Sequence, residues 1–162
     1  MNRTIIIKAK TFIFYKLACL AFTSCIIEPE NSNIPNARVS FYLDASISGV
    51  DNHLADGLLG NSKIYTKQEP AQLSPNGSYG YSGVVVVRAY DNNVYAFDIC
   101  CPYEVNKDIA LEDDGFFLKC PKCGSVFEIG NGTGYVNSGP ATQRLKKYHT
   151  TQNSAQKIRI YN

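Results

Sequence analysis

Two short cysteine-bearing segments constrain this chain more than any other feature. The first reads Cys100-Cys101-Pro102-Tyr103, and the second, after a spacer of sixteen residues, reads Cys120-Pro121-Lys122-Cys123-Gly124. The two-residue spacing of the second segment lets both thiolates reach a single tetrahedral ion. An even number of clustered cysteines indicates a metal site, a disulfide or both. A metal or a disulfide is therefore expected to tie these two segments together.

The chain around these cysteines predicts a single all-β domain from about residue 36 to residue 162. Short runs rich in β-branched and aromatic residues, bounded by polar or glycine-rich turns, are typical of strands. They occupy residues 39–43, 64–66, 84–90, 94–98, 116–119, 125–129 and 158–161. A weak helical pattern covers Leu54 to Leu59.

Two hairpins are expected from these runs. Four consecutive valines from Val84 to Val87 predict a strand that is buried on both faces, and residues 94–98 predict its antiparallel partner. The runs 116–119 and 125–129 flank Cys120 and Cys123, which predicts a second hairpin with both thiols at its tip.

From Gly83 onwards the order of these features resembles the Rieske iron–sulfur family. A hydrophobic hairpin leads into Cys101-Pro102, and a second hairpin carries Cys120 and Cys123. A glycine-rich turn follows, then Gly139-Pro140-Ala141, Leu145, Tyr148 and a terminal strand. The resemblance implies a Rieske-like fold of stacked antiparallel sheets with a two-loop cluster-binding subdomain. It also implies that Gly139, Pro140 and Ala141 form the loop that covers the cluster, and that Leu145 and Tyr148 re-enter the base sheet.

This chain differs from the family at the residues that would bind the cluster. A Rieske site takes Cys-x-His from one loop and Cys-x-x-His from the other, so that two thiolates hold one iron and two imidazoles the second. Here Tyr103 and Cys123 stand at the two histidine positions, and the chain's two histidines lie outside the loops. The candidate metal ligands are Cys101, Cys120, Cys123 and Cys100, with Tyr103 at a lost histidine position.

Three occupants of the altered site stay open at this point. Four thiolates can hold a [2Fe–2S] cluster, although the leader lacks the arginine pair that directs export of folded proteins with their clusters. Zinc accepts thiolates without assembly machinery, although adjacent residues such as Cys100 and Cys101 point to opposite sides of an extended chain. A disulfide such as Cys101–Cys120 would replace the metal and contribute roughly 3 kcal/mol.

The N-terminus predicts export and lipid anchoring. Residues 1–24 combine basic residues, an apolar stretch and small residues, which is typical of a signal peptide. Cys25 follows in a lipobox-like context and is the expected lipidation site, with residues 25–35 forming the lipidated cysteine and its tether. A plain signal peptide or a membrane anchor is the alternative, although the apolar stretch is short for a spanning helix. We therefore expect a location in the cell envelope of a Gram-negative bacterium, on the periplasmic or outer surface.

The net charge and the motifs argue against two classes of function, nucleic-acid binding and catalysis. The whole chain carries 16 basic and 14 acidic residues, and the leader holds four of the basic ones, which leaves 12 against 14 and a net charge of −2. This balance predicts no nucleic-acid-binding face, and no base–nucleophile arrangement that would indicate an enzyme is visible. The expected function is an envelope lipoprotein that carries electrons through an iron–sulfur cluster with altered ligands. The alternative is a structural or binding module with zinc or a disulfide. The expected partners are a redox or envelope protein, contacted by a monomer, and the membrane reached through the lipid.

Overall fold

The computed structural model describes residues 32–162, and the predicted leader, Cys25 and the first part of the tether lie outside them. The described chain forms strands joined by turns and a single 3-10 turn, η2, at Asn52–Leu54. The strands are β1 (Val39–Asp44), β2 (Ser62–Tyr65), β3 (Ser78–Tyr79), β4 (Val84–Arg88), β5 (Val94–Asp98), β6 (Glu112–Asp114), β7 (Phe117–Lys119), β8 (Val126–Glu128), β9 (Val136–Ser138), β10 (Lys147–Gln152) and β11 (Lys157–Tyr161). Within residues 32–162, no helix has the length and hydropathy needed to cross a bilayer.

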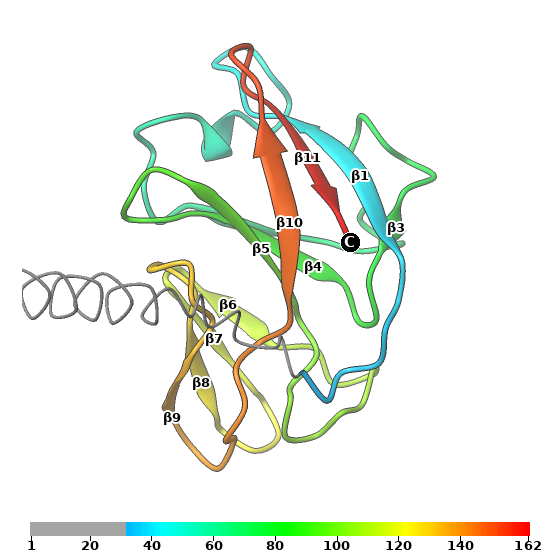
Figure 1. The fold of residues 1–162 in the computed structure, drawn as a ribbon, viewed down its shortest axis with the longest axis vertical. Helices are drawn as coiled ribbons and strands as arrows, with labels where there is room; N and C mark the ends of the chain where they lie inside the picture. Colours follow the sequence, from blue (N-terminus) through cyan, green and yellow to red (C-terminus); the bar gives the residue numbers. More distant parts are fainter. Residues whose placement is uncertain (1–31) are drawn as a thin grey trace, which may run out of the picture. The chain divides into compact units, whose positions relative to one another are not determined.

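The strands form two antiparallel sheets (Figure 1). The larger has seven strands in the order β2-β4-β5-β10-β11-β1-β3, and the smaller has four in the order β6-β7-β8-β9. The smaller sheet is an insertion between β5 and β10, so the chain leaves the larger sheet at residue 98 and returns at residue 147. Both cysteine segments lie within this insertion.

Two hydrophobic cores share strand β4. Val84 and Val86 point into the core enclosed by the larger sheet, and Val85 and Val87 point into the core between β4–β5 and the smaller sheet. All four side chains are fully buried, and burial of a valine side chain stabilises a fold by about 1.5–3 kcal/mol. The second core also contains Cys101 and Cys120. The cysteine loops are therefore packed directly on the larger sheet.

The predicted fold class is confirmed. The described chain is all-β with antiparallel sheets, and the two hairpins appear as β4–β5 and β7–β8. The prediction that β4 is buried on both faces is also confirmed. Tyr148 enters the larger sheet on β10, as the resemblance implied.

The helix expected at Leu54 to Leu59 is wrong. Only the 3-10 turn η2 forms, and it ends where Ala55 takes an extended conformation. Gly57 and Gly60 then adopt φ values of 83°, in the left-handed region that glycine reaches without a steric cost. These glycines turn the chain into β2, so the short apolar pattern does not continue as a helix.

Candidate functional site

The first cysteine segment follows the end of β5 and is fixed by the buried carboxylate of Asp98. This carboxylate accepts a hydrogen bond of 2.8 Å from the backbone N–H of Cys100 and one of 2.6 Å from the hydroxyl of Tyr148. It also accepts the N–H groups of Tyr81 and Ser82 at 2.8 and 3.3 Å. Asp98 is fully buried, and a buried carboxylate is stable only with several such donors. It thereby sets the direction in which the chain leaves β5.

The second cysteine segment is a tight turn at the tip of the β7–β8 hairpin. The N–H of Cys120 donates to the carbonyl of Ser125 at 2.8 Å, and the N–H of Gly124 donates to the carbonyl of Cys120 at 3.0 Å. The N–H of Cys123 points at the Cys120 sulfur, at 3.5 Å. Gly124 has a φ of 73°, which explains glycine at this position. The turn places both thiols on the same side of the hairpin tip.

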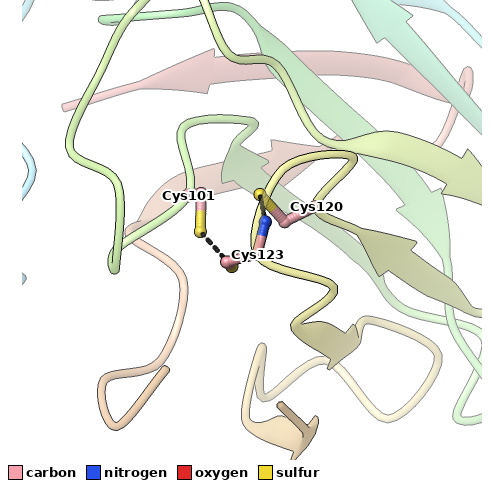
Figure 2. Close-up of side chains that lie close together, drawn as sticks. All are labelled: Cys101, Cys120 and Cys123. Carbon is pink, nitrogen blue, oxygen red and sulfur yellow. Dashed lines mark hydrogen bonds between the residues drawn. The ribbon is translucent and has the colours of Figure 1, made fainter. Parts of the chain in front are cut away.

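Three of the four predicted thiols converge. The sulfur atoms of Cys101, Cys120 and Cys123 all lie within 4.8 Å of one another, and those of Cys101 and Cys123 are 3.7 Å apart. Figure 2 shows Cys101 on one loop facing Cys120 and Cys123 on the other. All of these thiols, and that of Cys100, are free. Cys101 and Cys120 are fully buried, whereas Cys123 is partly exposed.

The structure does not bring Cys100 into this group. Its sulfur contacts the carbonyl oxygens of Cys101 and Asn106, at 3.7 and 3.8 Å. Its backbone pairs with Ala110 in an isolated bridge, so the chain is extended at this point and neighbouring side chains point to opposite sides. Because Cys101 faces the second loop, Cys100 faces away from the three-thiol group.

Tyr103, at the lost histidine position, is also outside the thiol group, and the residue is 56% exposed. Its neighbour Glu104 instead connects the two loops through a 2.6 Å ion pair with Lys122. Val105 has a φ of 47° while its N–H donates to the carbonyl of Cys101 at 2.9 Å. A β-branched residue in this region is strained, and such strain is concentrated at functional sites.

The thiols differ in how readily they ionise. Burial raises the pKa of Cys101 to about 12, although the backbone N–H groups of Glu104 and Tyr103 oppose this rise. Burial also raises the pKa of Cys100 to about 11. At Cys123 burial acts in the same direction, but hydrogen bonds from Ser125 and from the other two thiols outweigh it and lower the pKa. Buried thiols so close together ionise fully only when a cation compensates their charge.

Ser125 connects the expected covering loop to the thiols. Its hydroxyl accepts the N–H of Ala141 at 3.0 Å and lies 3.1 Å from the Cys123 sulfur. The Cys123 thiol donates to this oxygen, and once the thiol has ionised the hydroxyl hydrogen can point at the sulfur instead. Gly139 makes this approach possible, because a Cβ there would lie 2.5 Å from the Ser125 Cα. Gly139 and Pro140 are exposed and Ala141 is buried.

Sequence reasoning missed two residues of the site. Asp98 was assigned only as the end of a strand, and Ser125 only as the start of one. For Asp98, the one available indication was that its carboxylate comes directly before a cysteine loop. For Ser125, the resemblance implied that the loop with Ala141 returns to the cysteine segments, but nothing in the sequence indicated that the Ser125 hydroxyl would receive it.

No protein-family model matches this chain, and no curated protein matches it. Among solved structures, it is similar to a chain of the complex of reduced oxygenase and oxidized ferredoxin in carbazole 1,9a-dioxygenase. That match has 18% identity and a TM-score of 0.45, and it covers 76% of this chain and 93% of the other. A second similar structure is the ferredoxin of Sphingomonas yanoikuyae B1, with 24% identity and a TM-score of 0.36, over 49% of this chain and 74% of the ferredoxin. The function is therefore inferred from the cysteine geometry.

Proposed function

We propose that this domain binds one metal ion, of the zinc class, through the thiolates of Cys101, Cys120 and Cys123. The observation that carries the proposal is the convergence of three sulfurs within 4.8 Å. Two thiolates on a tetrahedral ion with metal–sulfur bonds of about 2.3 Å lie roughly 3.8 Å apart. The sulfurs of Cys101 and Cys123 are 3.7 Å apart, which agrees with this sulfur–sulfur distance. Thiolate ligands select soft and borderline metals over magnesium or calcium.

The residues do not fit the iron–sulfur cluster that the Rieske resemblance implies. A [2Fe–2S] cluster takes two ligands on each iron, four in all. Tyr103 is exposed, and the sulfur of Cys100 contacts carbonyl oxygens on the opposite side of its loop. Of the predicted ligands, only the thiols of Cys101, Cys120 and Cys123 are left. Three ligands are enough for a single ion but one too few for a cluster of two irons. An electron carrier is therefore the competing function, and it requires a fourth ligand from elsewhere.

A three-thiolate ion keeps one coordination position free. Structural zinc sites use four protein ligands, whereas sites with three leave a position for water or another ligand. Cys123 is the thiol nearest to solvent, since Pro121, Lys122 and Gly124 beside it are exposed. The free position would therefore face the side of the group from which a small ligand or an envelope partner can approach.

We also propose that the domain is lipid-anchored in the cell envelope through Cys25. The support is the order of basic, apolar and small residues before this cysteine. A bound ion at such a site needs only export of the chain and access to metal outside the cytoplasm. This agrees with a leader that has no arginine pair.

Metal analysis of the full chain, purified without oxygen and with a reductant, tests the metal proposal. We expect one equivalent of zinc, and after replacement by cobalt(II) the absorption of a thiolate-bound tetrahedral ion. Cys120→Ser should lose this ion, and Cys100→Ser, the matched control, should retain it. Two irons with sulfide would establish the electron carrier instead, and free thiols at Cys101, Cys120 and Cys123 without metal would overturn both functions.

A further inference from the structure

We propose that the three-thiol site contains a redox switch in which a disulfide oxidant joins Cys101 to Cys123 and thereby releases the bound ion. This inference rests on the proposed metal binding, because release presupposes an ion at the site. The disulfide itself depends only on the positions of the thiols. It differs from the Cys101–Cys120 bond, which the cysteine pattern left open as one alternative to a metal.

Access determines which thiol reacts first. Cys101 and Cys120 are fully buried. Cys123 is partly exposed, and Pro121, Lys122 and Gly124 beside it are exposed. An oxidant from solvent therefore meets the sulfur of Cys123 before the other two. Thiol–disulfide exchange requires such access as well as a thiolate.

Geometry then selects the second thiol. The sulfur of Cys101 lies 3.7 Å from that of Cys123, so a shift of under about 2 Å brings the pair to the S–S bond length of about 2.05 Å. Cys120 is less suited, because its sulfur accepts the N–H of Cys123 at 3.5 Å. A bond between Cys120 and Cys123 would compete with this contact, whereas a bond between Cys101 and Cys123 leaves the Cys120 sulfur where it is. The two loops are already held together by the ion pair between Lys122 and Glu104, so the first bond needs only local movement.

The chemistry balances in two exchange steps. The thiolate of Cys123 attacks one sulfur of the oxidant's disulfide, forms a mixed disulfide and expels one thiolate. The thiolate of Cys101 then attacks the Cys123 sulfur and expels the second. Two electrons pass from the two cysteines to the oxidant, which leaves as two thiols once protonated. The ion keeps its oxidation state and, with Cys120 as its last protein ligand, dissociates.

The test uses the full chain with zinc bound, treated with oxidised glutathione in the presence of a chromogenic zinc chelator. We expect release of one equivalent of zinc together with loss of two free thiols. After the remaining thiols are blocked, peptide mapping should find a Cys101–Cys123 disulfide. Cys100→Ser should behave as the parent chain, because this residue lies outside the thiol group.

Other outcomes would overturn the switch. A Cys120–Cys123 disulfide, a persistent mixed disulfide at Cys123, or zinc retained after the pair is oxidised would each contradict it. The same mapping on metal-free protein separates this inference from the proposed function. A chain that binds no zinc yet forms the Cys101–Cys123 bond disproves metal binding and the release step, while the thiol pairing is retained. A chain that binds zinc but forms another bond disproves the pairing alone.

Discussion

At the scale of single residues, the site depends on the direction in which two adjacent cysteines point. Cys101 faces the second loop and Cys100 faces away. The hydrogen bond from the N–H of Cys100 to Asp98 holds the backbone in the orientation that produces this arrangement. Adjacent residues alternate in an extended chain, so only one of the two can join the thiol group. This asymmetry can be measured by mutation.

Cys120→Ser should destabilise the metal-loaded domain by a few kcal/mol, because it removes a ligand and with it part of the binding free energy that supports the fold. Cys100→Ser should cost less, since a serine hydroxyl can donate to the carbonyls that the Cys100 sulfur now contacts. Chemical denaturation of both variants, with and without a chelator, measures the difference. Equal losses would mean that both adjacent cysteines hold the ion.

His53 should make stability depend on pH. Burial, followed by repulsion from Lys63, lowers its pKa below the ordinary 6.5, while Asp51 opposes this shift. Its Nε2 is buried without a hydrogen-bond partner in the described chain. A histidine with a lowered folded pKa binds its proton more readily when unfolded, so stability should fall as pH drops below about 6.5. Urea midpoints at pH 7.5 and pH 5.5 should show this fall in the parent and a smaller one in His53→Asn; an equal fall in both would exclude the histidine.

At the scale of elements, the candidate site is the contact between a loop, a hairpin tip and the segment that reaches Ser125 through Ala141. The hairpin and its thiols could be predicted because a β-rich run on either side of C-x-x-C is a local pattern. Strand β6 could not, because Glu112, Asp113 and Asp114 are all exposed and carry no hydrophobic alternation. Strand β10 is similarly polar, and its place between β5 and β11 is decided by pairing with distant residues. The spacing relative to Tyr103 favoured Cys101 over Cys100 as the cysteine that faces the second loop, but both stayed candidate ligands.

Ser125→Ala should weaken metal binding by about 10- to 100-fold, the range seen when a group that orients a ligand is removed. The change deletes the hydroxyl that lies between the N–H of Ala141 and the sulfur of Cys123. Competition with a zinc chelator gives the affinity. Ser138→Ala, on the exposed end of β9, is the matched control and should bind as the parent does. An unchanged affinity in Ser125→Ala would remove this residue from the site.

Val105→Gly should stabilise the domain by about 1 kcal/mol. The strain of a β-branched residue in the left-handed region costs on the order of 1–3 kcal/mol, and the larger backbone entropy of glycine in the unfolded chain offsets part of the gain. The urea midpoint of the metal-free protein measures the change without any contribution from metal. A loss of stability would mean that packing of the Val105 side chain outweighs its backbone strain.

At the scale of the whole molecule, the larger sheet acts as the base on which the cysteine loops are mounted. Cys101 and Cys120 are packed in the same core as Val85 and Phe97 of the larger sheet. A domain that loses its metal should therefore keep its larger sheet, since the core that holds Val84 and Val86 contains none of the cysteines. The proposed anchor, Cys25, lies outside the described residues and is tested separately.

Cys25→Ser should leave the fold of residues 36–162 intact and prevent lipid attachment. Stable membrane attachment needs more than one acyl chain, and a lipidated N-terminal cysteine would supply them. Fractionation of cells should find the parent in membranes and the variant in the soluble fraction, or retained with its signal uncleaved. Circular dichroism provides the control for folding. A variant found in membranes with its signal removed would exclude the lipid.

Asn33 ties the segment before β1 to the cysteine loops, and this has a mechanical consequence. The side-chain amide of Asn33 donates to the carbonyl of Pro102, and its backbone N–H donates to the side chain of Gln143, at 3.1 Å. Six residues later the chain enters β1, which is paired with β11 over five positions. Tension applied to the chain at Asn33 thus loads the loop of Cys101 and the segment at Gln143 before it reaches β1. Under force, the three sulfurs would lose their alignment while the larger sheet was still intact.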